Sequence, residues 1–213
     1  MRPIYYTLLL FGIVWTSFSY TYAQPFVPAT DVTAIRKKIA AASQTTAAIK
    51  SDFVQEKNLS MISEKVISKG LFYFKKDNRV RLEYIKPFNY LMIINNGKIL
   101  IKDDEKSTQI DMHRNKVFQE VNNIIINCVQ GTVFSGTDFN IAVFENAAQI
   151  KLEMLPTTKG LKEFFQSIFV FIDKKDYSAI RIEMNEISGD NTIISFTNKE
   201  INGKVDDTLF AVK

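Results

Sequence analysis

The stretch Arg79-Val80-Arg81-Leu82-Glu83-Tyr84 decides the fold of this chain, because charged and apolar side chains alternate along it without a break. Successive side chains of a β-strand point to opposite faces, so its three apolar residues share one face and its charged residues share the other. Phe72 and Phe74 have the same parity in the stretch before it. The pattern predicts a sheet whose apolar face looks inward.

About eleven runs of this alternating kind follow one another from Lys50 onward. Asn95-Asn96-Gly97 and Asn202-Gly203 can supply the positive backbone angles that tight hairpin turns require. Consecutive hairpins form an antiparallel meander, and a sheet of this many strands should curl into a barrel or half-barrel. The runs are approximately 51–59, 64–75, 79–86, 89–95, 98–103, 107–112, 138–145, 149–155, 167–173, 178–187 and 191–200, and residues 207–212 are a weaker candidate for a further run.

Two segments interrupt the strand pattern with apolar residues at helical spacing. Asp31 can cap a first helix, whose opposite face is basic, so the helix should lie on the sheet and not inside it. Residues 115–134 fit a second helix with one apolar face, although Ile124-Ile125-Ile126 also fits a buried strand. The apolar positions of the first helix are Val32, Ile35, Ile39, Ala42, Thr46 and Ile49.

The N-terminus resembles a secretory signal. Residues 1–23 hold one charge, Arg2, then an apolar run too short to span a bilayer comfortably, and end with small residues before Gln24. We expect cleavage before Gln24 and a single domain over residues 24–213, located in the periplasm. An uncleaved membrane anchor is the alternative.

The composition gives little support to catalysis or nucleic-acid binding. The net charge is only +4, and the lysine pairs are scattered, so we expect no nucleic-acid partner. Cys128 is the only cysteine and His113 the only histidine, and neither has neighbours at metal-ligand or nucleophile spacing. Adjacent carboxylates such as Asp103-Asp104 would point to opposite faces of a strand. We therefore expect no enzyme activity, no metal and no cofactor.

Four motifs in order resemble the periplasmic outer-membrane lipoprotein carrier family. They are Phe53-Val54-Gln55, then Gly70-Leu71-Phe72-Tyr73-Phe74-Lys75-Lys76, then Arg81-Leu82-Glu83-Tyr84 with Pro87, and Asn96-Gly97-Lys98. The resemblance implies a mainly β fold with some α-helix, in which a helical lid covers a half-open antiparallel β-barrel. It also implies an apolar cavity that holds acyl chains, whereas alternation alone fits a filled core equally well.

The resemblance assigns two sets of residues. The lid set includes Lys76, at the position where the family's best-known members have an arginine, and a lysine lacks the planar fork of donors. The chain also stops at Lys213 without an obvious tail after the last predicted strand. The lipid-binding set is Phe53, Phe72, Phe74, Val80, Leu82, Tyr84, Met92, Ile94 and Ile182, and the lid set is Lys76, Phe118, Val121 and Ile125.

As a family member, the chain would be a monomeric carrier of acylated lipoproteins. An inner-membrane ABC-type complex would load it, and an outer-membrane acceptor would receive the cargo. The lid should be less firmly packed than the core, so amides around Val121 and Ile125 should exchange faster than those around Leu82. The main alternative is a lipid-sensing or regulatory interaction module of the same fold. A lipid-modifying enzyme would need a nucleophile that the sequence does not offer.

Overall fold

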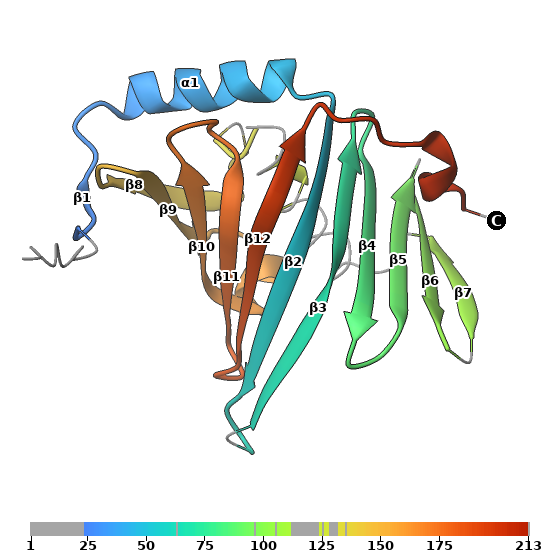
Figure 1. The fold of residues 1–213 in the computed structure, drawn as a ribbon. Coiled ribbons are helices and arrows are strands. Elements are labelled where there is room, and N and C mark those ends of the chain that lie inside the picture. Colours follow the sequence, from blue (N-terminus) through green and yellow to red (C-terminus); the bar gives the residue numbers. More distant parts are fainter. Residues whose placement is uncertain are drawn as a thin grey trace, which may run out of the picture.

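The computed structural model describes residues 24–62, 64–95, 97–104, 106–111, 124, 126–127, 132–134 and 136–212. Within them, twelve strands form one antiparallel sheet in the order β1-β8-β9-β10-β11-β12-β2-β3-β4-β5-β6-β7 (Figure 1). The strands are β1 (Val27–Pro28), β2 (Ala48–Leu59), β3 (Glu64–Lys75), β4 (Arg79–Lys86), β5 (Tyr90–Asn95), β6 (Lys98–Asp103), β7 (Ser107–Asp111), β8 (Phe139–Glu145), β9 (Gln149–Pro156), β10 (Phe165–Asp173), β11 (Ala179–Glu186) and β12 (Asn191–Ile201).

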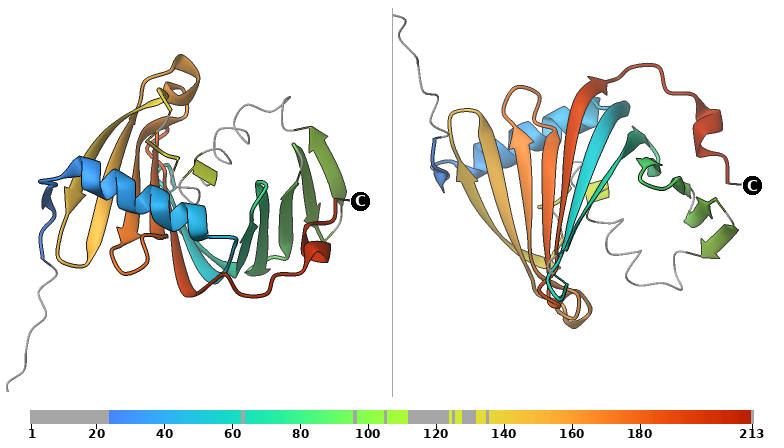
Figure 2. Two further views of the ribbon diagram at one scale, coloured as in Figure 1. Left: turned by 90° about the horizontal axis from the view of Figure 1, so that it is seen from above. Right: turned by 60° about the horizontal axis from the view of Figure 1, so that its bottom comes forward.

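The sheet curls but does not close. Seen from above, the strands around β8 and β9 face those around β6 and β7 across the interior (Figure 2). Among the described residues, β1 and β7 are the two edges of the sheet. The predicted mainly β, half-open antiparallel architecture is therefore confirmed, with twelve strands in place of about eleven.

The register of β3 and β4 follows from the alternation in their sequences. Phe72 lies opposite Leu82, and Phe74 lies opposite Val80, so these side chains form one buried layer. Gly70 sits at a register shift, where an added Cβ would lie 1.9 Å from the Glu83 carbonyl oxygen. Only glycine allows this approach, which explains why the motif begins with one.

Helix α1 (Val32–Thr45) lies above the upper ends of the strands from β8 to β2 (Figure 1). Asp31 caps it as predicted, because the Asp31 Oδ1 accepts a 2.9 Å hydrogen bond from the Ala34 amide. Ile35 and Ile39 are buried beneath it. The prediction that Thr46 and Ile49 continue the helix is wrong: Thr46 has an extended backbone, and Ile49 belongs to β2, where pairing with β3 replaces the helical bonds.

The C-terminal segment crosses the outer face of the sheet. After β12, residues 202–212 run beside β3 to β5 and include a 3-10 helix, η2 (Asp207–Phe210), so the predicted strand at 207–212 is wrong. Phe210 is fully buried and Val205 nearly so, in a second core cluster with Ile93 and Leu100. We call residues 203–212 the outer cover. Asp206 caps η2 by accepting from the Thr208 amide, which favours a helical turn over an extended strand.

The described helices are few. Besides α1 and η2, a single turn of helix, α3 (Lys159–Lys162), joins β9 to β10. In the part of the chain that the structure describes, no helix has the length and apolar character needed to cross a membrane.

Candidate functional site

The nine residues of the predicted lipid-binding set belong to one apolar cluster on the inner face of the sheet. The seven most buried have exposed fractions of 3% or less, and the other two are partly buried against them. Neighbouring strands bring them together, since Leu82 lies opposite Met92, and Val80 lies opposite Ile94. The buried members are Phe53, Phe72, Phe74, Val80, Leu82, Ile94 and Ile182, and the partly buried ones are Tyr84 and Met92.

Tyr84 and Gln55 form a polar contact at the edge of the apolar interior. The Tyr84 hydroxyl donates a 2.8 Å hydrogen bond to the Gln55 Oε1, and its ring packs edge-on against Phe53. Burial, and to a lesser extent the neighbouring Tyr90, raises the pKa of Tyr84 to about 12. Tyr84 is therefore neutral at physiological pH, and it adds apolar surface to the interior without leaving a buried polar group unpaired.

Helix α1 is the cover of the upper end. Its buried face contributes Ile35 and Ile39 to the inner cluster, while Arg36, Lys37 and Lys38 are exposed. We call α1 the inner cover. Burying two isoleucines contributes only about 3–6 kcal/mol before the entropy of ordering is subtracted. Val32 packs partly buried against the same cluster, and Arg36 and Lys38 lie over the rings of Phe134 and Tyr177. The inner cover therefore has a small buried apolar face.

Two side chains hold the C-terminal end of the inner cover to the sheet. The Lys76 Nζ donates a 2.8 Å hydrogen bond to the Gln44 carbonyl oxygen. Asn202 accepts from the Ala47 amide at 2.6 Å and donates to the Thr45 carbonyl oxygen at 2.9 Å. The last carbonyls of a helix lack intrahelical partners and carry partial negative charge, so a cation suits this position.

Lys76, which was predicted to belong to the lid, therefore contacts the C-terminal end of α1. The other predicted lid residues, Phe118, Val121 and Ile125, lie outside the described residues. Ile124, Ile126 and Val133, from the same stretch of sequence, are buried in the inner cluster. The described part of this stretch therefore packs inside the curled sheet.

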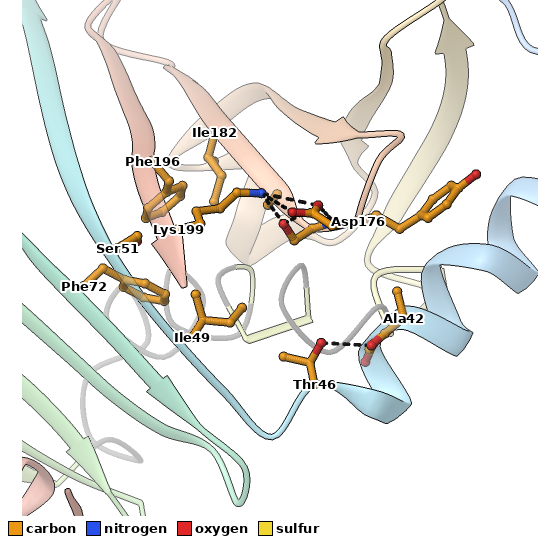
Figure 3. A pocket seen from close by; sticks show the side chains of 13 residues that line it. Ala42, Thr46, Ile49, Ser51, Phe72, Asp176, Ile182, Phe196 and Lys199 are labelled. Atoms are coloured by element: carbon orange, nitrogen blue, oxygen red, sulfur yellow. Dashed lines mark hydrogen bonds and ion pairs between the residues drawn. The ribbon is translucent and has the colours of Figure 1, made fainter. Parts of the chain in front are cut away.

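A small cavity lies under the C-terminal half of α1 (Figure 3). Its volume is about 20 Å³, enough for one water molecule, whereas ligand pockets usually measure about 300–1,000 Å³. It marks the point where the inner cover, the sheet and the β10–β11 turn meet. The lining includes Thr46, Ile49, Ser51, Phe72, Ile182 and Phe196.

The cavity has one unusual polar group. Ser51 is 2% exposed, and within the described residues its Oγ has no hydrogen-bond partner. A buried hydroxyl without a partner costs free energy, so this position is open to an acceptor or donor atom that enters the cavity. Ser51 has the same parity as Phe53 in the sequence, but the sequence gives no signal that its hydroxyl is unpaired.

A charged cluster lies at the edge of the same cavity. The Lys199 ammonium lies 3.1 Å from the Asp176 carboxylate and also donates to the Ser178 hydroxyl. Burial alone would raise the pKa of Asp176, but hydrogen bonds from Ser178 and Lys199 outweigh it and lower that pKa. The described residues hold no group of three or more potential metal ligands.

The fold and the site define a class of proteins in which a curled antiparallel sheet encloses an apolar interior and a helix covers one end. The family model of the outer membrane lipoprotein carrier protein LolA matches residues 44–213, which is most of the chain. The chain therefore belongs to this family, and the resemblance in its sequence motifs is confirmed. Members of the family are carrier or binding proteins.

Several solved structures have a similar fold. The LolA superfamily protein NE2245 from Nitrosomonas europaea is 8% identical with a TM-score of 0.47, over 86% of this chain and 99% of that one. Lipoprotein LppX from Mycobacterium tuberculosis is 9% identical with a TM-score of 0.41, over 83% and 99%. MucB is 11% identical with a TM-score of 0.50, over 87% and 64%. None of the curated proteins matches the chain.

Proposed function

We propose that this protein is a periplasmic carrier that binds the acyl chains of lipoproteins in its apolar interior and shuttles them from the inner to the outer membrane. The observation that carries the proposal is the contrast between the inner face and its cover. The face is a continuous apolar surface, but the helix above it buries only two isoleucines fully. Its other contacts are the partly buried Val32, the cation–π contacts of Arg36 and Lys38, and a few hydrogen bonds. Such a cover can leave without unfolding the sheet.

In this proposal loading requires the inner cover to move, because the cavity directly under α1 has room for only about one water molecule. When α1 leaves, acyl chains can contact the residues that line this cavity, including Phe72 and Ile182. The arrangement with α1 over the inner face is then the closed state. Apolar cover in this state keeps the interior from binding unwanted partners.

The energy of loading must come from outside the chain. Extracting an acyl chain of about fifteen methylenes from a bilayer costs roughly 12 kcal/mol, at about 0.8 kcal/mol for each methylene. The sequence has no nucleotide-binding motif. An inner-membrane ABC-type release complex would supply this energy, and an outer-membrane acceptor would receive the cargo.

In this proposal the protein works as a monomer without enzyme activity, cofactor or metal. Residues 1–23 act as a cleavable signal, and residues 24–213 form the carrier domain. Both core clusters and all described strands lie between Val27 and Val212, so the chain from Gln24 onward contains the complete sheet. The nine inner-face residues named above form the surface that contacts acyl chains.

The alternative function is a regulatory or lipid-sensing module of the same fold. A mainly polar interior would favour it. The inner face is instead mainly apolar from β9 to β6, with Ser51, Gln55 and Thr192 among its few polar positions. The carrier proposal is therefore better supported.

The test is to purify the protein from the envelope of its own cell, extract it with organic solvent and identify bound lipids by mass spectrometry. Acylated lipoproteins should accompany the wild-type protein in stoichiometric amounts. Regulatory function without cargo predicts a partner protein and no acyl chains. Leu82→Glu places a charge in the interior and should abolish lipid recovery.

Ile85→Glu is the matched control, because the same change falls on the same strand at an exposed position of the opposite parity. It should keep its lipid. Circular dichroism establishes that both variants are folded. Normal cargo on folded Leu82→Glu would contradict the assignment of the inner face as the binding surface.

A further inference from the structure

The β2–β3, β4–β5 and β11–β12 turns lie at the lower end of the sheet, opposite α1 (Figure 1). Each of these turns carries an exposed apolar side chain. Met61 and Ile62, on the β2–β3 turn, are 92% and 60% exposed. Phe88 on the β4–β5 turn is 75% exposed, and Ile187 on the β11–β12 turn is 59% exposed. We call these four residues the lower ridge. Single exposed apolar residues are common, but a row of them at one end of a molecule marks an interaction surface.

Hydrogen bonds between turns hold part of this ridge in place. The Ser60 amide donates to the Asp190 carboxylate at 2.9 Å, and the Ser60 hydroxyl donates to the Ser188 carbonyl oxygen at 3.2 Å. Ile187 lies in the second of these two turns, so it is fixed beside Met61 and Ile62. The Ser60 amide also lowers the pKa of Asp190, which keeps its carboxylate charged as the acceptor. The ridge is thus a preorganised feature.

The charges beside the ridge indicate what it contacts. Lys69 and Lys86 lie directly opposite each other on β3 and β4, next to the Phe88 turn, and both are exposed. Like charges at such positions repel, and neither lysine has a hydrogen bond or ion pair within the described residues. By contrast, Lys57 and Lys65 nearby are paired with acidic residues. The unpaired lysines are therefore available for an anion.

We propose that the lower end of the sheet docks on the surface of a phospholipid bilayer. The lower ridge enters the boundary between headgroups and acyl chains, and Lys69 and Lys86 bind headgroup phosphates. Apolar residues in the acyl boundary with lysines at the headgroup level are the usual composition of an interfacial contact. A side chain as exposed as Met61 protrudes, which suits a fluid surface better than a protein partner that would need a matching pocket.

The docking proposal goes beyond the carrier function and is tested separately from it. The sole tryptophan, Trp15, precedes Gln24, so the chain from Gln24 onward has none. Ile62→Trp therefore places a single tryptophan in the ridge. Its fluorescence should shift to shorter wavelength on vesicles of phosphatidylethanolamine and phosphatidylglycerol. Val27→Trp on β1, at a similarly exposed position away from the ridge, should show no shift.

Loss of binding is measured by sedimentation with the same vesicles. The combined change Met61→Ser, Ile62→Ser and Ile187→Ser should weaken binding at least about tenfold, because three apolar contacts with the acyl boundary are lost. Val27→Ser is the matched control and should bind like wild type. Met61, Ile62 and Ile187 are exposed, so the triple variant should keep its fold, and thermal unfolding checks this.

Lys69→Gln with Lys86→Gln should weaken binding about fivefold for each lysine and remove the preference for anionic lipid. Lys37→Gln with Lys38→Gln, on the exposed face of α1, is the control. Absence of vesicle binding by the wild-type chain would overturn the proposal. Equal binding by the ridge variant, or an equal loss in the Val27 control, would overturn it as well.

Discussion

The inner and outer faces of the same sheet are covered in different ways. The inner cover, α1, buries Ile35 and Ile39, and its C-terminal end is held by Lys76 and Asn202 through bonds to backbone atoms. The outer cover has a fully buried aromatic residue, Phe210, at its centre. The first resembles a lid and the second a permanent part of the core.

The polar contacts of the outer cover include two ion pairs. Lys75 and Arg79 both bind the Asp207 carboxylate, with Lys75 at 2.6 Å. Arg81 donates to the Leu209 carbonyl oxygen at 3.1 Å, and Asn95 donates to the Phe210 carbonyl oxygen at 2.9 Å. Charge-assisted bonds of this kind are stronger than neutral ones. The difference indicates a firmly held cover on the outer face, and it supports the proposal that the cover of the inner face moves.

Cross-linking the inner cover should have the largest effect on function. Ala42 on α1 and Ala179 on β11 both line the small cavity, so cysteines there can be bridged by a short thiol-reactive reagent, in a Cys128→Ser background. If α1 must leave for loading, the bridged protein should bind no lipidated peptide, and each single-cysteine variant should bind normally. Fluorescence anisotropy with a labelled lipidated peptide measures this.

The outer cover provides the control for that experiment. Leu91 and Leu209 both pack in the outer cluster, and bridging cysteines at these positions should leave peptide binding unchanged. Equal loss of binding after either cross-link would show that the two covers do not differ in the way proposed. Normal binding with α1 bridged would show that the inner cover does not move.

Phe210→Ala should have the largest effect on stability. It removes a fully buried aromatic ring from the outer cluster and leaves a cavity, so the free energy of unfolding should fall by about 3–5 kcal/mol. Urea unfolding measures the change. Ile187→Ala, at an exposed position, should stay within about 0.5 kcal/mol of wild type. A loss below about 1 kcal/mol in Phe210→Ala would mean that the outer cover is not part of the core.

The inner face could be predicted from the sequence because alternation specifies it strongly. In β4, the charged residues Arg79, Arg81 and Glu83 fall on every second position, so only one register buries the apolar set. Tyr84 fits the same parity, and its hydrogen bond to Gln55 satisfies its one polar group. The predicted inner parity and the observed burial therefore agree for a simple physical reason.

The outer cover was missed, although the sequence contained a signal for it. Leu91-Met92-Ile93-Ile94 is apolar at every position, which is typical of a strand buried on both faces. The pattern therefore indicates that another segment of the chain covers Leu91 and Ile93 on the outer face of the sheet. The bonds from Lys76 and Asn202 to α1 could not be predicted, because they depend on where two distant backbone segments come to lie.

Lys76→Leu should have a smaller effect on stability and a clear effect on release. It removes one hydrogen bond at an exposed helix end, which is worth about 0.5–1.5 kcal/mol. Amides in the last turn of α1 should exchange faster with solvent, while those around Leu82 should not change. Transfer of lipidated peptide to acceptor vesicles should be faster than for wild type.

Lys76→Arg is the control, since an arginine can also donate to the Gln44 carbonyl oxygen and should restore slow exchange. If Lys76→Leu leaves both exchange and transfer unchanged, Lys76 is an ordinary solvated lysine. If stability falls by several kcal/mol, the inner cover is held as firmly as the outer one. Either result would remove the contrast between the two covers.

The smallest expected effect is a dependence of the outer cover on pH. Hydrogen bonds from Lys75 and Arg79 lower the pKa of Asp207 below its ordinary value. A carboxylate with a lowered pKa in the folded state contributes stability above its unfolded pKa, near about 3.9, and that contribution is lost as the pH falls through the folded value. In the inner cover, Lys76 donates to the Gln44 carbonyl oxygen, and this acceptor does not titrate.

Urea midpoints of wild type and Asp207→Asn should therefore differ by a constant amount between about pH 5 and 7 and converge below about pH 4. Comparing the midpoints of the two proteins at each pH cancels the contributions of the other carboxylates. Added salt should reduce the difference between the midpoints, because Asp207 is exposed. A difference that persists unchanged at low pH would show that the ion pairs of Asp207 do not hold the outer cover.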